Sequence, residues 1–296
     1  MSQPFHGCGT ALITPFAADQ SVDEAAYRRL IRWQIDEGID FLVPCGTTGE
    51  TPTLHLDEHK RLVAIAVEEA RKAARPVPVL AGASSNATAH AVELARAMAA
   101  LGADGVLIVA PYYNKPTQEG LYQHFAAVAA AVKLPVVLYN VPGRTSSNIE
   151  AATTLRLAAI PNIVAVKEAS GNLSQIGAIL AAAPKGFEVL SGDDALTLPM
   201  IAMGAQGLVS VASNVMPRAM TELVRRARKG DVNAARALHF KYLALMEANF
   251  IESSPGPVKC AMAHLGYCQE VYRLPTVAVR PATRELMLAV LKDLGL

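Results

Sequence analysis

The sequence predicts an α/β protein, a (β/α)8 TIM barrel with a helical appendage at its C-terminal end. Short apolar runs alternate with longer amphipathic segments, and about eight such units follow one another at a spacing of roughly 25–35 residues. The runs lack the polar alternation of a half-exposed strand, which indicates a parallel sheet covered by helices. After Met216 the pattern becomes purely helical.

The expected strands are apolar segments that are too short for helices, most of them bounded by glycine, proline or a polar residue. In chain order they are residues 10–14, 40–46, 78–82, 105–111, 135–140, 163–167, 187–192 and 207–211. Eight is the number of strands that closes a barrel of this type.

The expected helices carry apolar residues at helical spacing, and several end at a glycine or a proline. The first has a start signal at residues 21–24, whose letters SVDE fit a capping box. Between the strands the helices are residues 23–37, 57–74, 87–101, 118–132, 150–159, 173–183 and 195–203, and four more follow at 217–229, 232–250, 257–265 and 281–294.

We expect two parts, a barrel with the active site at 1–229 and a C-terminal helical domain at 230–296. No low-complexity linker separates them, so the second should pack on the first. A doubly wound open sheet is the competing architecture. The lack of a GxGxxG sequence after the first strand and the eightfold repeat both favour the barrel.

The composition argues against several classes of function. Of the 296 residues 52% are hydrophobic, which is enough for a large core. Lys and Arg number 27 and Asp and Glu 26, a formal net charge of +1, which gives no basis for binding nucleic acid or an anionic membrane. No apolar run approaches the length of a membrane span.

The cysteines and the N-terminal segment indicate a cytoplasmic protein. Cys8, Cys45, Cys260 and Cys268 form neither a CxxC pair nor a cluster with histidine at zinc-ligand spacing. We therefore expect reduced thiols and no metal. Residues 1–16 lack the cationic and apolar regions of a signal peptide.

The segment NIVAVKEASG supplies the central candidate for catalysis. Its short apolar run ends in a single lysine, Lys167. Burial can lower the pKa of an amine from its usual ~10.4 by roughly 3–5 units, and an uncharged amine can attack a carbonyl carbon. We therefore take Lys167 as a Schiff-base candidate. The competing interpretation is a strand-end lysine that pairs with a carboxylate such as Glu168 or reaches solvent.

Chemistry in such a barrel lies at the C-terminal ends of the strands, where several strands here carry polar residues. The second ends in GTTGE, in which glycines around Thr47 and Thr48 allow a turn whose N–H groups suit a carboxylate or a phosphate. The fifth ends in YNVPGRT, and neighbouring strands lie ~4.8 Å apart, so Tyr139 should approach Lys167. A phenol there can shuttle protons, and Arg144 can hold a carboxylate. The plain alternatives are an ordinary glycine turn and a surface arginine.

Other strand ends have weaker functional interpretations. The fourth strand leads into PYYNKP, whose Tyr112 and Tyr113 suit either packing or an interface. The seventh ends in SGDD, where Asp193 or Asp194 invites a metal hypothesis. No third or fourth ligand is in view, and we expect one of the two carboxylates to cap the next helix. None of the seven histidines falls at a strand end, so histidine has little support as a general base.

Four motifs carry a resemblance to a known family: GTTGE, PYYNKP, YNVPGRT and IVAVKEASGN, in this order and at these spacings. They resemble the dihydrodipicolinate synthase family, which belongs to the lysine-dependent aldolases together with N-acetylneuraminate lyase. The similarity covers nearly the whole chain. GTTGE and the lysine of the sixth strand mark the wider group, whereas YNVPxRT with Arg144 is the more specific sign.

The resemblance implies a lyase of lysine and diaminopimelate biosynthesis, with the covalent imine on its lysine and no metal or organic cofactor. It would condense pyruvate with L-aspartate 4-semialdehyde to give 4-hydroxy-tetrahydrodipicolinate. Lys167 would form the imine with pyruvate, and the turn at Thr47 and Thr48 would bind its carboxylate. Tyr139, Thr47 and Tyr113 would form a proton relay, with Tyr113 supplied by a neighbouring subunit of a homotetramer built as a dimer of dimers.

The resemblance also implies roles for residues around the imine. Arg144 would grip the carboxylate of aspartate semialdehyde, and Gly192 and Val209 would line the pocket behind the imine. These residues match the family pattern at the ends of the fifth, seventh and eighth expected strands.

One departure from the family concerns feedback inhibition. Many members are inhibited by lysine at the dimer interface, with the help of a histidine and a glutamate, and those positions hold Leu56 and His90 here. Leucine cannot hydrogen-bond the ligand, and histidine is a poor partner for an ammonium group, so we expect weak or absent inhibition. The remaining candidate positions of that allosteric site keep suitable residues: Thr51, His59, Asn86 and Tyr112.

Two other functions stay open. The same fold and imine serve aldolases, lyases and dehydratases that act on a sugar acid or a hydroxy-keto acid, and Arg144 is the residue that discriminates. A noncatalytic effector-binding barrel is the third hypothesis. The intact set of Lys167, Tyr139, Thr47 and Tyr113 argues against it, because a binding protein needs no proton relay.

Overall fold

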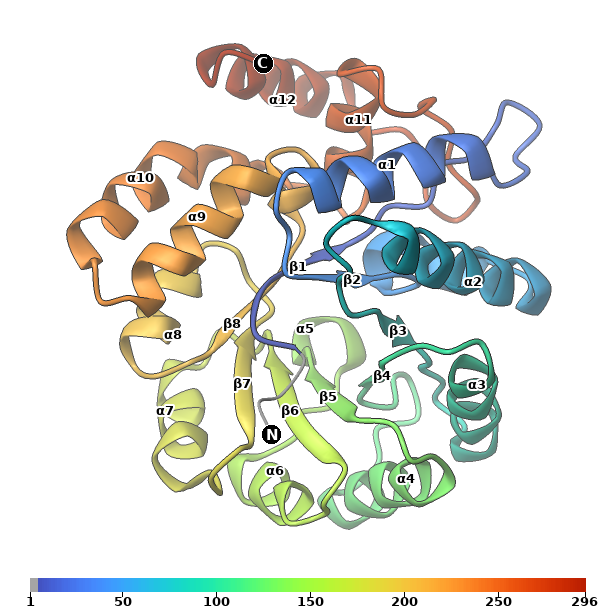
Figure 1. The fold of residues 1–296 in the computed structure, drawn as a ribbon, viewed down its shortest axis with the longest axis vertical. Coiled ribbons are helices and arrows are strands. Elements are labelled where there is room, and N and C mark those ends of the chain that lie inside the picture. Colours follow the sequence, from blue (N-terminus) through green and yellow to red (C-terminus); the bar gives the residue numbers. More distant parts are fainter. Residues whose placement is uncertain (1–4) are drawn as a thin grey trace.

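The computed structural model describes residues 5–296, which form a barrel of parallel strands ringed by helices (Figure 1). The last strand pairs in parallel with the first, which confirms the predicted (β/α)8 barrel and excludes an open doubly wound sheet. The strands are β1 (Gly7–Ala11), β2 (Phe41–Val43), β3 (Leu80–Gly82), β4 (Gly105–Val109), β5 (Val136–Asn140), β6 (Ile163–Glu168), β7 (Glu188–Ser191) and β8 (Gly207–Ser210).

The strands β2 and β3 are joined by fewer paired residues than the other neighbouring strands. Their pairing consists of one bridge, Leu42 with Val79, and flanking bonds such as the one from Gly82 N to Pro44 O at 3.0 Å. A Cβ atom added at Gly82 would lie 1.9 Å from the carbonyl oxygen of Cys45. The barrel therefore closes here because a glycine lets the two backbones approach.

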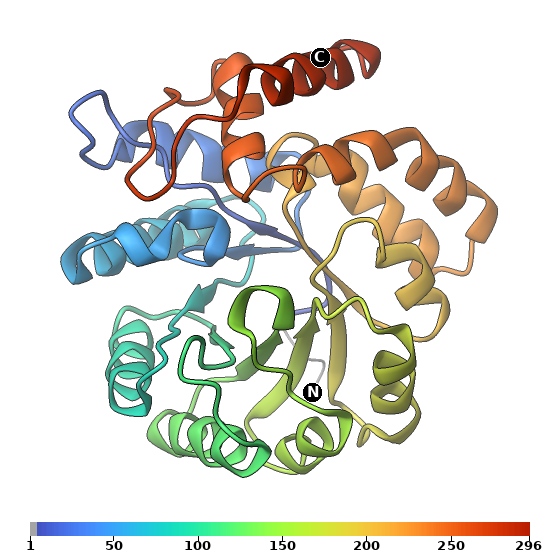
Figure 2. The same ribbon diagram turned by 180° about the vertical axis from the view of Figure 1, so that it is seen from behind.

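The helices lie outside the strands, and the predicted ones are present with bounds shifted by a few residues (Figures 1 and 2). The short α5, which lies in front of the strands in Figure 2, was not expected. The helices are α1 (Glu24–Asp36), α2 (Leu56–Lys72), α3 (Thr88–Ala100), α4 (Gln118–Ala131), α5 (Pro142–Thr145), α6 (Ala151–Ala158), α7 (Leu173–Ala182), α8 (Thr197–Ala202), α9 (Pro217–Arg228), α10 (Val232–Ala248), α11 (Gly256–His264) and α12 (Pro281–Asp293), with 3-10 turns η1 (Thr47–Gly49), η2 (Thr51–Thr53) and η3 (Ala212–Asn214).

Two local predictions near the N-terminal end were wrong. The first strand lies earlier than residues 10–14, because Thr14 leaves the ladder and donates its hydroxyl to Gly49 O at 2.7 Å. The N-cap of α1 is Asp23, whose carboxylate accepts from Ala26 N at 2.9 Å, so residues 21–24 do not form a capping box. Ser21 instead donates its hydroxyl to Asp19.

The prediction that Asp193 or Asp194 caps a helix was also wrong. Helix α8 begins at Thr197 and has no side-chain cap. Asp194 is buried and accepts hydrogen bonds from Ser210 Oγ and from the backbone N–H groups after β8. Burial raises the pKa of Asp194, and these hydrogen bonds oppose the rise. The carboxylate therefore anchors the end of β8 to the loop after β7.

Alternation along the strands separates two layers of core. Even positions of β5, and of β6 after the irregularity at Val164, face the helices, as Val166 does, whereas odd positions such as Ala165 face the barrel interior. The inner cluster comprises Phe5, Ala11, Phe41, Val43, Leu80, Leu107, Val137, Tyr139, Val141, Val164, Ala165, Leu190 and Val209. Lys167 therefore shares the interior face with Tyr139.

The C-terminal helices pack on the barrel. Helix α10 contacts α9 and α12, and Trp33 of α1 stacks on Tyr267 after α11 with ring centroids 4.3 Å apart. Figure 1 shows α11 and α12 beside α1. The boundary between residues 229 and 230 stays a prediction, and residues 1–4 of the first predicted part lie outside the described residues.

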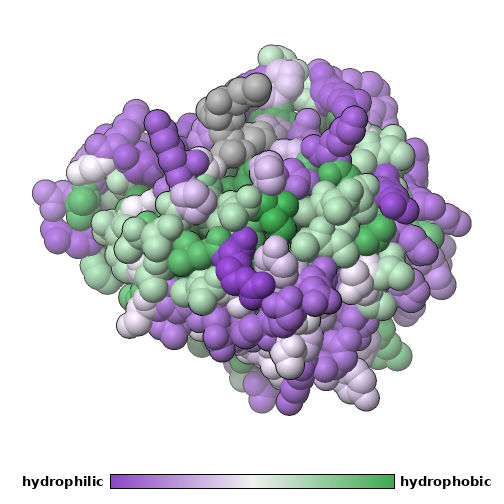
Figure 3. All heavy atoms as spheres, turned by 90° about the horizontal axis from the view of Figure 1, so that it is seen from below, coloured by the Kyte–Doolittle hydropathy of each residue, from purple (hydrophilic) through white to green (hydrophobic). Residues whose placement is uncertain are grey.

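The outer surface is mixed in character. On the face seen from below in Figure 1, apolar side chains lie among hydrophilic ones (Figure 3). Within residues 5–296 no helix combines the length and the apolar character needed to cross a bilayer.

Candidate active site

Lys167 lies at the C-terminal end of β6, directly beside Tyr139 of β5. The two residues are register partners, and Lys167 Nζ lies 4.1 Å from the centroid of the Tyr139 ring. Lys167 is 6% exposed, and among residues 5–296 its amine makes no hydrogen bond or ion pair. The interpretation of a surface lysine, or of one paired with Glu168, is therefore wrong. The amine is free to meet an incoming carbonyl group.

Glu168 points away from Lys167, into the layer between the strands and the helices. Its Oε1 accepts from Asn140 Nδ2 at 2.6 Å and from Gln175 Nε2 at 3.1 Å. Its Oε2 accepts from the backbone N–H and the hydroxyl of Ser170. Strand alternation sets this arrangement, because residues next to each other on a strand face opposite sides. Glu168 thus fixes the end of β6 and forms no ion pair with Lys167.

The threonines of GTTGE form η1, a tight turn at the end of β2. The residues with a left-handed backbone conformation at this turn are not glycines. Cys45 has φ +55° and Glu50 has φ +53°. Gly49 serves close approach instead, because a Cβ atom there would lie 3.2 Å from Leu12 O. Within residues 5–296 the hydroxyls of Thr47 and Thr48 make no hydrogen bond, so both are available to a ligand.

A small cavity of about 30 Å³ joins these groups at the C-terminal mouth of the barrel. Of the predicted site residues, Lys167, Tyr139, Thr47, Thr48, Arg144 and Gly192 line it together. Val209 lies in the inner cluster and does not line this cavity, whereas Val211, just past the end of β8, does. The cavity is lined by Ala11, Val43, Gly46, Thr47, Thr48, Leu107, Tyr139, Arg144, Lys167, Gly192, Val211, Phe250 and Ser254.

Gly192 is packed against the side chain of Lys167. A Cβ atom added there would lie 2.9 Å from Lys167 Cε and 2.8 Å from Ala169 Cβ. Its backbone N–H donates to Glu168 O at 2.7 Å. The glycine therefore leaves room for the lysine chain while the backbone holds β7 to β6.

Arg144 lies on α5, between the barrel mouth and the C-terminal segment. Its Nη2 donates to Ser254 O at 3.4 Å, and Ser254 and Phe250 line the cavity on that side. Sequence reasoning missed both residues, because nothing in their local pattern distinguishes them from ordinary helix-end residues. Only the packing of the C-terminal helices brings them to the mouth.

Tyr113 does not reach this cavity within one chain. It is 88% exposed with φ +75°, on a loop that Asn86 and Asn114 hold in place. Asn114 Nδ2 donates to Asn86 O at 2.8 Å, and Asn86 Nδ2 donates to Tyr112 O at 3.2 Å. The loop thus presents the Tyr113 ring outward in a fixed conformation.

A larger cavity of about 410 Å³ adjoins the small one and shares Thr47, Tyr139 and Arg144 with it. Four positions of the predicted allosteric site line it: Thr51, Leu56, His59 and Tyr112. Two others, Asn86 and His90, do not line it, and His90 is exposed on α3. His59 bonds Gly82 O at 2.8 Å, and burial lowers its pKa.

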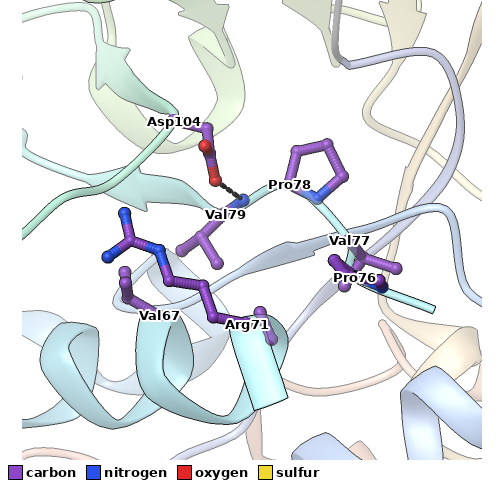
Figure 4. A pocket seen from close by; sticks show the side chains of 8 residues that line it. Val67, Arg71, Pro76, Val77, Pro78, Val79 and Asp104 are labelled. Carbon is purple, nitrogen blue, oxygen red and sulfur yellow. Dashed lines mark hydrogen bonds between the residues drawn. The ribbon is translucent and has the colours of Figure 1, made fainter. Parts of the chain in front are cut away.

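A third cavity, of about 240 Å³, lies at the opposite end of the strands, beside the start of β3 (Figure 4). Its polar groups are already engaged: Asp104 accepts from Val79 N at 2.8 Å, and Arg71 donates to Gly102 O at 2.9 Å. Apolar side chains such as Val67 and Val77 form the rest of its wall. It brings no reactive side chains together.

The cysteines and acidic residues show no metal site in the described part of the chain. No group of three or more His, Cys, Asp or Glu residues within 5–296 could hold a metal ion. All four cysteines are free. Burial raises the pKa of the Cys268 thiol to about 11 and also raises the pKa values of Cys8, Cys45 and Cys260. Such thiols are poor nucleophiles at neutral pH.

Comparison with known proteins places this geometry in a family. A model described as the dihydrodipicolinate synthetase family matches residues 4–294. The chain belongs to the dihydrodipicolinate synthetase family. The predicted family, barrel fold and enzyme class, a lyase of lysine and diaminopimelate biosynthesis, are thereby confirmed.

Individual members of the family are similar over nearly their whole lengths. The 4-hydroxy-tetrahydrodipicolinate synthase of Koribacter versatilis (strain Ellin345) is 59% identical over 98% of this chain and 96% of its own. The dihydrodipicolinate synthase of Aquifex aeolicus superposes with a TM-score of 0.96 at 45% identity, covering 99% of each chain. The chloride-inhibited dihydrodipicolinate synthase of Acinetobacter baumannii, complexed with pyruvate, superposes with a TM-score of 0.95 at 41% identity. The match covers 98% of this chain and 99% of that one.

Proposed function

We propose that this chain condenses pyruvate with L-aspartate 4-semialdehyde to give 4-hydroxy-tetrahydrodipicolinate. The observation that carries the proposal is the unpaired, nearly buried amine of Lys167 beside Tyr139, in a cavity that the GTTGE threonines also line. The Acinetobacter baumannii relative was crystallised with pyruvate, which supports a keto acid as first substrate. We further propose that the chemistry needs no metal or organic cofactor and takes place in the cytoplasm.

The covalent steps follow from the chemistry of an imine. Lys167 Nζ attacks C2 of pyruvate, and loss of water leaves a C=N bond that withdraws electrons from C3. A C3 proton then leaves, and the resulting enamine attacks the aldehyde carbon of the second substrate. The amino group of that substrate displaces Lys167 from C2 and closes the ring, which frees the lysine.

The residues around Lys167 fit the proton transfers and the binding of the carboxylate. The turn of Thr47 and Thr48 offers hydroxyl and N–H donors to the carboxylate of pyruvate. The phenol of Tyr139 moves protons to and from the carbonyl oxygen of pyruvate. Gly192 leaves space beside the Lys167 chain, and Val209 belongs to the inner cluster of the barrel together with Tyr139.

Arg144 determines the choice of second substrate in this proposal. It lines both cavities and within residues 5–296 makes one long hydrogen bond, 3.4 Å to Ser254 O, so most of its donors stay free there. A guanidinium group binds a carboxylate through two parallel hydrogen bonds. Aspartate semialdehyde carries such a carboxylate next to the amine that must displace Lys167.

Tyr113 completes the proton relay from a second copy of the chain. Its 88% exposure and fixed loop support this role, because a ring held out of its own cavity is available to a neighbour. The exposed Tyr112 and Leu56 near the larger cavity support an interface on the same side. We therefore propose a homotetramer of two such dimers.

Feedback inhibition by lysine should be weak or absent. Leu56 is half exposed at the larger cavity and offers no hydrogen bond, and His90 lies on the exposed face of α3. Thr51, His59 and Tyr112 line the cavity, but His59 is already bonded to Gly82 O. An ammonium ligand would therefore lack an acidic partner there.

A coupled assay tests the proposal. Pyruvate and aspartate semialdehyde are supplied, and product is detected through a reductase that consumes it, with and without added lysine. We expect turnover that lysine below about 1 mM lowers little or not at all. Comparable turnover of a panel of sugar acids would favour a related aldolase, and failure with every pyruvate–aldehyde pair would contradict an enzymatic role.

A further inference from the structure

A buried ion pair links the C-terminal helices to the turn that contains Thr47 and Thr48. Nζ of Lys259 on α11 lies 2.5 Å from Oε1 of Glu50. The side chain of Lys259 is 0% exposed and that of Glu50 is 1% exposed. Removing two charges from water costs several kcal/mol per ion, so such a pair is weak grounds for stability alone. Its position suggests what it does instead.

Glu50 is the residue that ends the turn. It has the left-handed conformation, φ +53° and ψ +33°, which is unfavourable for a residue with a side chain. Its N–H donates to Thr47 O at 3.1 Å, and its own carbonyl oxygen accepts from Thr53 N at 2.9 Å. Whatever holds Glu50 therefore also holds the backbone of Thr47 and the N–H groups around it.

The C-terminal segment surrounds the pair on its other sides. Arg273 N donates to the second Glu50 oxygen at 3.4 Å, while the Arg273 side chain forms two hydrogen bonds to Glu58 of α2. Lys259 Nζ and the Arg273 guanidinium lie 4.1 and 4.3 Å from the centroid of the buried Phe16 ring. These contacts leave the Glu50 carboxylate little room to move.

We propose that Lys259 is a positioning residue, which holds Glu50 in its left-handed conformation and so preorganises the turn of Thr47 and Thr48 for the carboxylate of pyruvate. The inference rests on the proposed function, because it concerns the same turn and the same substrate. By this proposal, the C-terminal helices contribute to the binding of pyruvate. Burial lowers the pKa of Lys259 and Glu50 opposes that change, in keeping with a mutually dependent pair.

The proposal separates binding from chemistry. The turn follows β2, whereas the nucleophile Lys167 stands on β6, several strands away in the sheet order. Loss of the pair should therefore raise the pyruvate concentration needed for imine formation, while the rate at saturating pyruvate changes little. A merely structural role would lower the amount of folded protein and leave this concentration unchanged.

The test uses borohydride trapping of the pyruvate adduct, measured by mass spectrometry over a range of pyruvate concentrations. The variant Glu50→Gln/Lys259→Met removes both charges together, since deleting one alone leaves the other buried and unpaired. The control Arg28→Met/Glu69→Gln removes a partly buried pair between α1 and α2, which is joined to Glu68 and Arg32 and does not touch the turn. Circular dichroism and thermal unfolding establish that each variant is folded.

We expect the half-saturating pyruvate concentration to rise about tenfold or more in the double variant, equivalent to about 1.4 kcal/mol of binding. The control and the wild type should agree with each other. An unchanged half-saturation in the folded double variant overturns the proposal. Absence of any adduct in the wild type would instead contradict the proposed function, so the two failures are distinguishable.

A second variant covers the case in which the double variant does not fold. Glu50→Asp keeps both charges but shortens the side chain by one methylene, so that its carboxylate no longer reaches Lys259 Nζ as in the wild type. It should raise the half-saturating concentration in the same direction by a smaller factor. If folded Glu50→Asp binds pyruvate like the wild type, Lys259 does not position the turn.

Discussion

Asn140 and Glu168 form a hydrogen bond of 2.6 Å on the helix side of the sheet, directly behind Tyr139 and Lys167 on the barrel side. Both pairs are register partners of β5 and β6, so the outer pair fixes the relative position of the inner one. Each strand therefore carries one residue of the proposed reaction and a neighbour that holds it in place.

Replacing Asn140 should disturb both stability and imine formation. The variant Asn140→Ala leaves the buried Glu168 with fewer partners, at a cost of about 1–3 kcal/mol. A shift of Lys167 against Tyr139 should also slow adduct formation, on the order of tenfold to a hundredfold. Denaturant unfolding measures the first effect, and stopped-flow or quenched borohydride trapping measures the second.

Asn162 supplies the matched control at the other end of β6. Its Nδ2 donates to Ala129 O, Val132 O and Leu134 O, far from the barrel mouth. Asn162→Ala should lower the free energy of unfolding without slowing imine formation in the folded protein. Equal slowing by Asn140→Ala and Asn162→Ala would show that the outer pair has no special effect on Lys167.

A methyl group at Gly192 should displace the lysine chain. In Gly192→Ala the new Cβ would lie 2.9 Å from Lys167 Cε, closer than carbon atoms approach without a shift. We expect imine formation to slow by about tenfold or more, because small misplacements of a nucleophile are costly. The control is Gly143→Ala on α5, where no atom of residues 5–296 outside its chain neighbours and its own helix backbone lies within 4 Å of the added Cβ. Trapping rates at saturating pyruvate compare the two, and a normal rate in Gly192→Ala would contradict the geometry.

Loss of the Arg144 side chain should affect the second substrate alone. In Arg144→Ala we expect kcat/KM for aspartate semialdehyde to fall about 10- to 100-fold. This is the decrease expected when a hydrogen bond between two charged groups is lost. Adduct formation with pyruvate should stay near the wild-type rate. Steady-state kinetics and trapping are measured on the same preparation, and Arg156→Ala on α6 controls for loss of a surface arginine. Equal damage to both steps would argue against carboxylate recognition by Arg144.

The stability of the protein should fall in mild acid, in part through His124. Burial lowers the pKa of His124 to about 4, whereas an unfolded histidine has a pKa of about 6.5. Between these values the unfolded chain binds a proton that the folded chain does not, so the free energy of unfolding decreases as pH falls. The contribution is at most about 3 kcal/mol.

Urea unfolding at several pH values between about 4 and 6.5 measures this effect against the variant His124→Gln. In the wild type, Nδ1 of His124 forms a hydrogen bond with Thr88 Oγ1 at 3.0 Å. Within residues 5–296, the buried Nε2 of His124 has no partner that could support a positive charge. The variant should show a shallower decrease of stability with falling pH. Identical slopes would mean that His124 does not contribute.

The sequence predicted those parts of the fold and site that depend on short-range pattern. Apolar runs and helix-end glycines locate the strands and helices. The expected neighbourhood of the fifth and sixth strands, with both residues at strand ends, places Tyr139 beside Lys167. The same reasoning could not detect the pair of Lys259 and Glu50, whose members are 209 positions apart. Only the packing of the C-terminal helices brings these two side chains together.

The wrong predictions share a physical reason, which is competition between local and tertiary partners. The SGDD sequence resembles a helix start, yet Asp194 finds stronger partners in Ser210 and the backbone after β8. The glycines of GTTGE were expected to allow a tight turn with exposed N–H groups. The positive φ angles at this turn fall on Cys45 and Glu50, and Gly49 serves close approach.

The most direct test is the identification of the lysine that captures pyruvate. The protein is incubated with pyruvate and borohydride, digested and analysed by tandem mass spectrometry, with Lys167→Ala treated in parallel. We predict one reduced pyruvate adduct, on Lys167, and none in the variant. An adduct on another lysine, or one that persists in Lys167→Ala, would contradict the central claim that the unpaired amine beside Tyr139 is the nucleophile.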